Sequence, residues 1–107
     1  MDMDGPWSWG NVTAEKLVEI RQFLANLESM EWNHLLHQDR AHTIARWKLS
    51  KDAQNRLEEV GQEDVDDLIS LRKTGKERIC GIKDRDVLKI LWWDPEHTVY
   101  PVERRNT

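Results

Sequence analysis

The sequence offers little support for a disulfide framework or a membrane span. It contains one cysteine, Cys80, whose neighbours in a predicted strand are apolar, and we expect a buried, unreactive thiol there. No stretch approaches the roughly 18 uninterrupted apolar residues of a membrane-spanning helix. The N-terminus, MDMDGPWSW, is acidic where a signal peptide would be basic and then apolar. These absences predict a cytoplasmic protein without a membrane partner.

Length and aromatic content indicate one modest core. The 107 residues are 38% hydrophobic, which suits a single domain over 1–107 and is too short for two ordinary domains. Six tryptophans accompany one phenylalanine and one tyrosine. Three of them fit core or seam positions, and the other three suit an interface, where indoles are enriched. The first group is Trp32, Trp47 and Trp92, and the second is Trp7, Trp9 and Trp93.

Charge is unevenly distributed along the chain, although the net value is only −4. Residues 58–67 contain six acids and no base, whereas residues 72–89 contain seven bases against three acids. A local excess of +4 on a predicted hairpin favours contact with phosphate groups. The same charges would also keep a solvated hairpin from aggregating through its edges. Both interpretations stay open at this point.

Capping residues and apolar spacing predict three helices. Thr13 can cap a helix with an apolar stripe of Leu17, Ile20, Leu24 and Leu27. Ser29 can cap a second, shorter helix over 30–36, so that residues 13–37 form a helical hairpin or a bent helix, followed by a linker at 38–40. Ser50 can cap a third from Lys51 to about Val60, which Gly61 closes in the left-handed conformation.

Four strands are expected in the remainder of the chain, over 42–49, 68–72, 77–83 and 87–93. The last one, VLKILWW, is apolar at both odd and even positions, which is typical of a strand covered on two faces. We therefore predict that it is central, with 42–49 on its free edge. The resulting fold class is α+β, with two N-terminal helices followed by an antiparallel-rich four-stranded sheet that carries one packed helix.

Turn positions predict which side chains share a face of this sheet. If Lys73 faces Lys76, then Arg72 faces Glu77, and Ile69 and Leu71 join Cys80 and Trp92 on one face. The opposite face then carries a mixed set of side chains. Should the N-terminal helices cover that second face, a groove on it would be filled. The set is Leu68, Ser70, Arg72, Glu77, Ile79, Lys83, Val87, Lys89, Leu91 and Trp93.

An imidazole and a phenol follow the last strand. After Asp94-Pro95 the chain continues with His97 and Tyr100, which suits proton transfer at a sheet edge. The alternative is a structural turn, made by the Asp94 side chain, in which His97 caps backbone groups and Tyr100 packs. The spacing of His34, His37, His42 and Glu31 is only weak evidence for a zinc site. We predict neither a metal nor a cofactor.

The order of elements resembles the RelE/ParE superfamily of toxin–antitoxin toxins. The resemblance covers residues 42–102 and leaves 1–38 as a helical extension. It lies in the late apolar strand that ends at Trp93 and in a set of short matches along the hairpin and C-terminal segment. These are Leu71-Arg72, Gly75, Arg78-Ile79, His97 and Val99-Tyr100.

Such a resemblance implies a bacterial toxin that an antitoxin peptide or protein neutralises. Members of the RelE branch cleave messenger RNA on the ribosome without a metal. Arg78 would then stabilise the transition-state charge, while His97 and Tyr100 would transfer or orient protons. Basic residues on the sheet would contact phosphate, with a base stacked on Trp93; they are Arg72, Lys83 and Lys89. The alternative is a non-catalytic protein-interaction module, or a homodimer, on the same fold.

Overall fold

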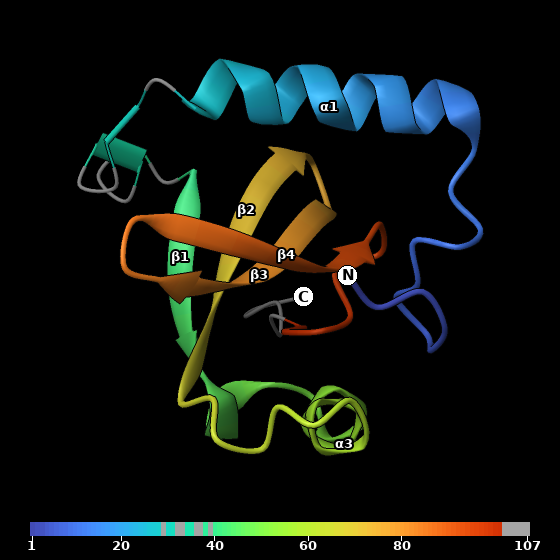
Figure 1. Cartoon of the computed structure of the whole chain (residues 1–107), viewed down its shortest axis with the longest axis vertical. Coiled ribbons are helices and arrows are strands. Elements are labelled where there is room, and N and C mark those ends of the chain that lie inside the picture. Colours follow the sequence, from blue (N-terminus) through green and yellow to red (C-terminus); the bar gives the residue numbers. More distant parts are fainter. Residues whose placement is uncertain (29, 32–33, 36–37, 39, 102–107) are drawn as a thin grey trace, which may run out of the picture.

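A computed structural model describes residues 1–28, 30–31, 34–35, 38 and 40–101. In this part the chain forms an antiparallel four-stranded sheet with helices on both sides, an α+β fold as expected (Figure 1). The second N-terminal helix, expected over 30–36, lies partly on residues outside the described part and is not confirmed. The elements are α1 (Ala14–Glu28), β1 (Ala41–Ala45), the 3-10 turn η1 (Arg46–Lys48), α3 (Lys51–Glu59), β2 (Asp67–Thr74), β3 (Glu77–Asp84) and β4 (Val87–Asp94).

The two long helices begin where their caps predict. The hydroxyl of Thr13 accepts a hydrogen bond from the Lys16 backbone N–H at 3.2 Å, and that of Ser50 accepts one from Ala53 at 3.2 Å. Gly61 follows α3 with a φ of +77°, the left-handed conformation expected for it. Both helices are therefore specified by local sequence.

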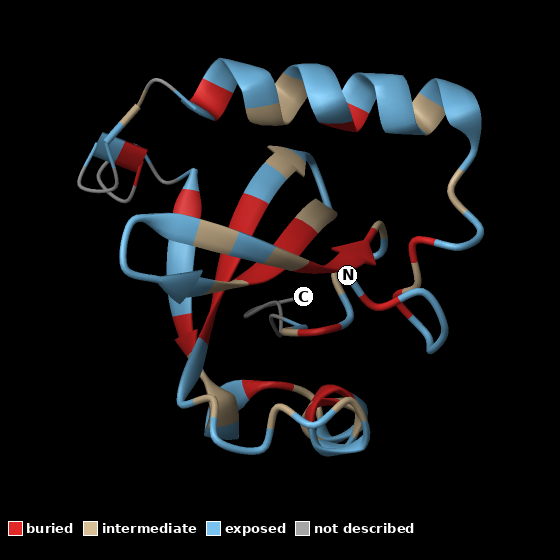
Figure 2. Cartoon of the chain, viewed as in Figure 1, coloured by how far each residue is buried: buried red, intermediate tan, exposed pale blue. Residues whose placement is uncertain are grey.

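The sheet lies between α1 and α3, with an apolar cluster on each side (Figures 1 and 2). Because both faces are covered, the sheet residues of β2 to β4 are apolar in long runs. The α3 side is built on Ala53, Leu57, Leu68, Cys80 and Trp92, and the α1 side on Ile20, Leu27, Ile69, Leu71, Ile79 and Trp93. Of the predicted α1 stripe, Leu17 is exposed.

The predicted central position of β4 is wrong. The strand order is β1-β2-β3-β4, so β4 is an edge strand of the sheet and β1 pairs with β2, with Ala41 opposite Leu71. Burial on two faces arises from the two helical layers and does not require a strand on each side. The apolar pattern of β4 correctly predicts that both faces of the strand are covered, but it does not indicate which strands lie beside it.

Residues 2–9, here called the N-terminal strap, cover the free edge of β4. The Asp2 N–H donates to the Leu91 carbonyl at 3.0 Å, and the Trp93 N–H donates to the Trp7 carbonyl at 3.1 Å. The indole of Trp7 packs against Trp92 on one face of the sheet, with ring centroids 4.9 Å apart. The strap thereby protects an edge that would otherwise be open to pairing with another chain.

The tryptophan expectations are partly wrong. Trp92 is fully buried, as predicted, but Trp7, Trp9 and Trp93 are buried within this chain instead of lying at an interface. Trp9 packs on Trp93 with ring centroids 6.2 Å apart. Trp47, predicted for a core or seam position, is 74% exposed, and Trp32 lies outside the described residues.

The predicted pairing of β2 with β3 is off by one residue. Thr74 is opposite Glu77 and Arg72 is opposite Arg78, with a register shift between Arg72 and Thr74. A one-residue slip exchanges the two faces of a strand. Ile69 and Leu71 therefore lie on the α1 side with Ile79, whereas Cys80 and Trp92, which were predicted to share their face, lie on the α3 side.

The second turn of the meander is also shifted by one residue from its predicted position. Asp84, instead of Lys83, lies opposite Val87. A second register shift, between Cys80 and Gly81, restores the predicted sharing of faces at the other end of the hairpin. Cys80 lies opposite Trp92 there, and Ile79 lies opposite Trp93.

Candidate functional site

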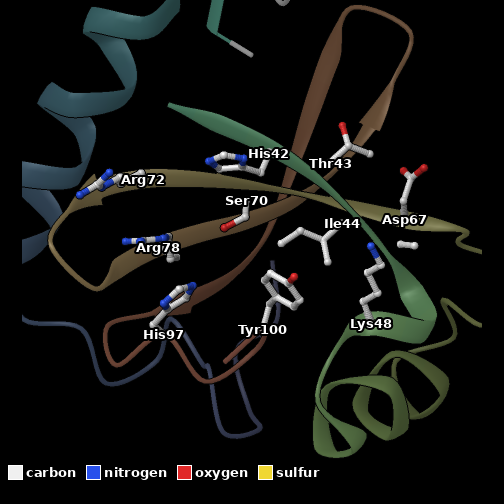
Figure 3. A pocket seen from close by; sticks show the side chains of 11 residues that line it. His42, Thr43, Ile44, Lys48, Asp67, Ser70, Arg72, Arg78, His97 and Tyr100 are labelled. Atoms are coloured by element: carbon white, nitrogen blue, oxygen red, sulfur yellow. The ribbon is translucent and has the colours of Figure 1, made fainter. Parts of the chain in front are cut away.

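A pocket of about 510 Å³ opens on the α3 side of the sheet, between its first three strands and the segment that follows β4 (Figure 3). Its lining combines three cationic side chains with two imidazoles, two hydroxyls, one carboxylate and a phenol. The volume is in the range of small-ligand sites. The lining residues are His42, Thr43, Ile44, Ala45, Lys48, Asp67, Ser70, Arg72, Arg78, His97 and Tyr100.

Four residues that sequence reasoning selected meet in this pocket: Arg72, Arg78, His97 and Tyr100. The reason is the register shift after Arg72, which turns this side chain toward the α3 side, next to Arg78. Helix α1 covers the opposite side, so the N-terminal helix does not fill this pocket. The structure tests their proximity and leaves their roles as predictions.

Two guanidinium groups form one end of the pocket (Figure 3). Arg72 and Arg78 are direct cross-strand partners, and the Arg78 guanidinium donates to the carbonyls of Gly75 at 2.6 Å and Glu77 at 3.1 Å. The expected pair between Arg72 and Glu77 is wrong. The Glu77 carboxylate binds Lys16 of α1 at 3.2 Å and Lys73 at 3.3 Å instead.

The turn after β4 places the imidazole. The buried Asp94 carboxylate accepts hydrogen bonds from the N–H groups of Thr98 at 3.0 Å and Val99 at 2.9 Å, which confirms the predicted side-chain turn. His97, inside this turn, has a φ of +60°, a left-handed conformation that histidine tolerates better than most residues. Trp7 of the strap donates to the Thr98 hydroxyl at 2.8 Å, so the strap supports the turn as well.

The surroundings of His97 favour a neutral ring. Burial lowers the pKa of its imidazole below the usual 6.5, and the positive charge of Arg78 lowers it further, against a smaller opposing effect of Asp94. In Figure 3 the ring points toward Arg78. At neutral pH the imidazole is therefore able to accept a proton beside a guanidinium.

Three of the predicted phosphate and base contacts lie outside the pocket. Lys83 is exposed in the β3–β4 hairpin, and Lys89 forms an ion pair with Asp84 at 3.2 Å. Trp93 is buried on the α1 side against Trp9. Of the seven bases in 72–89, two line the pocket, Arg72 and Arg78.

Sequence reasoning missed His42 and Lys48 as pocket residues. His42 lies opposite Ser70, because β1 pairs with β2. Lys48 is the last residue of η1, the turn in which the chain leaves the sheet, and its side chain lines the pocket from there. The alternation of 42–45 places His42 and Ile44 on one face, so the signal was present, but it required the correct partner strand.

The histidines considered for zinc do not gather in the described part of the chain. No group of three or more metal-ligating side chains occurs among the residues that the structure describes. His34 is exposed, and its ring lies 2.8 Å from the Gln38 amide nitrogen. His37 falls outside the described residues.

Comparisons with family models, curated proteins and solved structures give no match for this chain. Within residues 1–28 and 40–101 and the few described between them, no helix has the length and apolar character needed to cross a bilayer. The case for function therefore depends on the pocket.

Proposed function

We propose that the pocket binds the phosphate backbone of single-stranded RNA and that the chain is a toxin of RelE/ParE type. The observation that carries this proposal is the meeting of Arg72, Arg78, His97 and Tyr100 in one pocket. Strands β2 and β3 and the C-terminal segment supply these groups from separate parts of the chain. All four residues belong to the short matches, along the hairpin and the C-terminal segment, in which the chain resembles that superfamily.

The charge pattern favours an anionic ligand. Arg72 and Arg78 are direct cross-strand partners, and both line the pocket, so two positive charges are placed at one end of it. A phosphate placed between two guanidinium groups can accept charge-assisted hydrogen bonds from both. Lys48 supplies a further positive charge at the other end of the pocket (Figure 3). An extended polyanion suits this spread better than a single ion does.

The chemistry we propose is attack of a ribose 2′-hydroxyl on the adjacent phosphorus. The neutral imidazole of His97 takes the hydroxyl proton, and Arg78 stabilises the charge that develops on the phosphorane oxygens. The bond to the 5′-oxygen of the next nucleotide breaks, and the Tyr100 phenol donates or orients the proton for that leaving oxygen. The products are a 2′,3′-cyclic phosphate and a 5′-hydroxyl end.

Induction of the gene in bacteria, with growth and transcript integrity as readouts, tests the proposal. The native chain should arrest growth and cleave transcripts, and Arg78→Gln, His97→Gln and Tyr100→Phe should each lose at least tenfold in cleavage rate. Lys89→Gln is the matched control, because this lysine is paired with Asp84 on the distant hairpin. Circular dichroism verifies that the variants fold.

The results distinguish a nuclease from a binding module. Harmless expression of the native chain, with intact transcripts, would rule out the toxin activity and favour the non-catalytic module. Equal cleavage by all four variants would place the chemistry outside this pocket. Purified protein provides a further test, because replacing the attacking 2′-hydroxyl of an RNA substrate with hydrogen should abolish cleavage and leave binding intact.

A further inference from the structure

Trp47 is an exposed indole beside the pocket. Its exposed fraction is 74%, whereas Trp7, Trp9, Trp92 and Trp93 are all buried. An indole has a large flat apolar surface, and leaving it in water forgoes the gain that the other four obtain by packing. Such an exposed aromatic side chain is a candidate contact surface for a ligand.

The backbone around Trp47 is held in place on both sides. The Arg46 N–H donates to the Asp66 carbonyl at 2.8 Å, and the Arg46 guanidinium donates to the Gln62 carbonyl at 3.1 Å. On the other side Leu49 is buried, and the Ser50 N–H donates to the Val99 carbonyl at 2.8 Å. The indole therefore projects into solvent from a fixed turn.

Lys48 connects this indole to the pocket. Its ammonium lies 5.2 Å from the centroid of the Trp47 ring, and its side chain lines the pocket at the end away from Arg72 and Arg78 (Figure 3). Lys48 therefore contacts the exposed indole and also lines the pocket that contains the two guanidinium groups. Grooves that bind single strands combine positive charge with aromatic side chains on which bases stack.

We propose that Trp47 stacks with a base of single-stranded RNA whose backbone passes Lys48 and enters the pocket. The inference rests on the proposed function and adds a base contact to it: at least one base of the single strand is splayed out of its stack and lies on the indole. Bases inside a duplex have no free face for the indole. Stacking tolerates any base, so we expect binding with little sequence preference.

Fluorescence anisotropy with a labelled single-stranded RNA 8-mer at low salt tests the stacking. Trp47→Ala should weaken binding about 5- to 100-fold, the range for the loss of one base–aromatic stack, and Trp47→Phe should retain most of the affinity. Val87→Ala is the control, because Val87 is also an exposed apolar residue but lies on the distant hairpin. A strand with abasic sites throughout should bind the native chain and Trp47→Ala equally.

The experiment separates this inference from the proposed function. If Arg78→Gln weakens RNA binding and Trp47→Ala does not, stacking is excluded and the phosphate pocket stands. If Trp47→Ala weakens binding and Arg78→Gln does not, stacking stands and the pocket is not the phosphate site. A duplex that binds as tightly as the single strand, or an effect of Trp47→Ala that persists with the abasic strand, would also exclude stacking. Absence of RNA binding by the native chain would overturn both.

Discussion

The attachment of the N-terminal strap depends on one buried carboxylate. The Asp2 side chain is 3% exposed and accepts hydrogen bonds from the Arg56 guanidinium at 2.8 Å on each oxygen, and from the Trp92 indole at 2.9 Å. Arg56 lies on α3 and Trp92 on β4, so Asp2 joins three parts of the chain. We predict that Asp2→Asn, which keeps the size and removes the charge, substantially destabilises the fold.

The size of this effect follows from the pKa of Asp2. Hydrogen bonding to Arg56 lowers it from 3.8 to about 2, against the opposing effect of burial. At about 1.4 kcal/mol per pKa unit, the shift from 3.8 to about 2 contributes about 2 to 3 kcal/mol to the free energy of unfolding at neutral pH. The asparagine amide would also place N–H groups against the guanidinium, so we expect a total loss of about 2 to 4 kcal/mol.

Urea denaturation followed by tryptophan fluorescence measures this loss. Because the folded-state pKa is the lower one, the contribution of Asp2 is complete above pH 4 and disappears as the pH falls toward 2. The difference between the native chain and Asp2→Asn should therefore shrink over that range. Asp4→Asn is the control, since Asp4 is an exposed acid in the same segment. Equal stability of the two variants at pH 7 would refute the reasoning.

Three further predictions concern the sheet and the turn after β4. Asp94→Ala removes the acceptor for Thr98 and Val99, and it should cost about 2 to 3 kcal/mol in the free energy of unfolding, measured by urea denaturation. If stability falls by less than 0.5 kcal/mol, the carboxylate does not hold the turn. Gly81→Ala would place a Cβ 2.6 Å from the Lys89 carbonyl oxygen, so the melting temperature should drop by several degrees in a thermal scan. An unchanged melting temperature would mean that the strands separate at no cost. Burial raises the pKa of the Cys80 thiol to about 12. A thiol reagent at pH 8 should therefore react with Cys80 only when the protein unfolds, and the rate of labelling should equal the rate of unfolding. Labelling of the folded protein within seconds would contradict this burial.

Local features of the chain were predictable because local chemistry produces them. Thr13 and Ser50 cap helices through side chains that lie next to the helix in sequence, and Gly61 ends one by its backbone freedom. The Asp94 turn is of the same kind, since its acceptor and donors are four and five residues apart. Each of these features depends on residues that are no more than five positions apart in the sequence.

The order of the sheet could not be deduced from side-chain pattern. Apolar residues at odd and even positions of β4 indicate cover on two faces, and helices α1 and α3 provide that cover. Whether a strand is central depends on the backbone hydrogen bonds at its edges, and the hydropathy of the side chains carries no information about those bonds. At β4 the partner is the strap around Asp2 and Trp7, which carries no strand pattern.

The residues of the pocket could be selected from sequence, but their arrangement could not. Arg78, His97 and Tyr100 stand out because their side chains bind anions and move protons, which is a property of residue type. Arg72 reaches them through a register shift of a single residue at the β2–β3 turn, and His42 through the pairing of β1 with β2. Short-range chemistry therefore specifies the helices, the turns and the reactive groups. Long-range backbone pairing, which depends on the free energy of the whole assembled sheet, specifies which of those groups face one another.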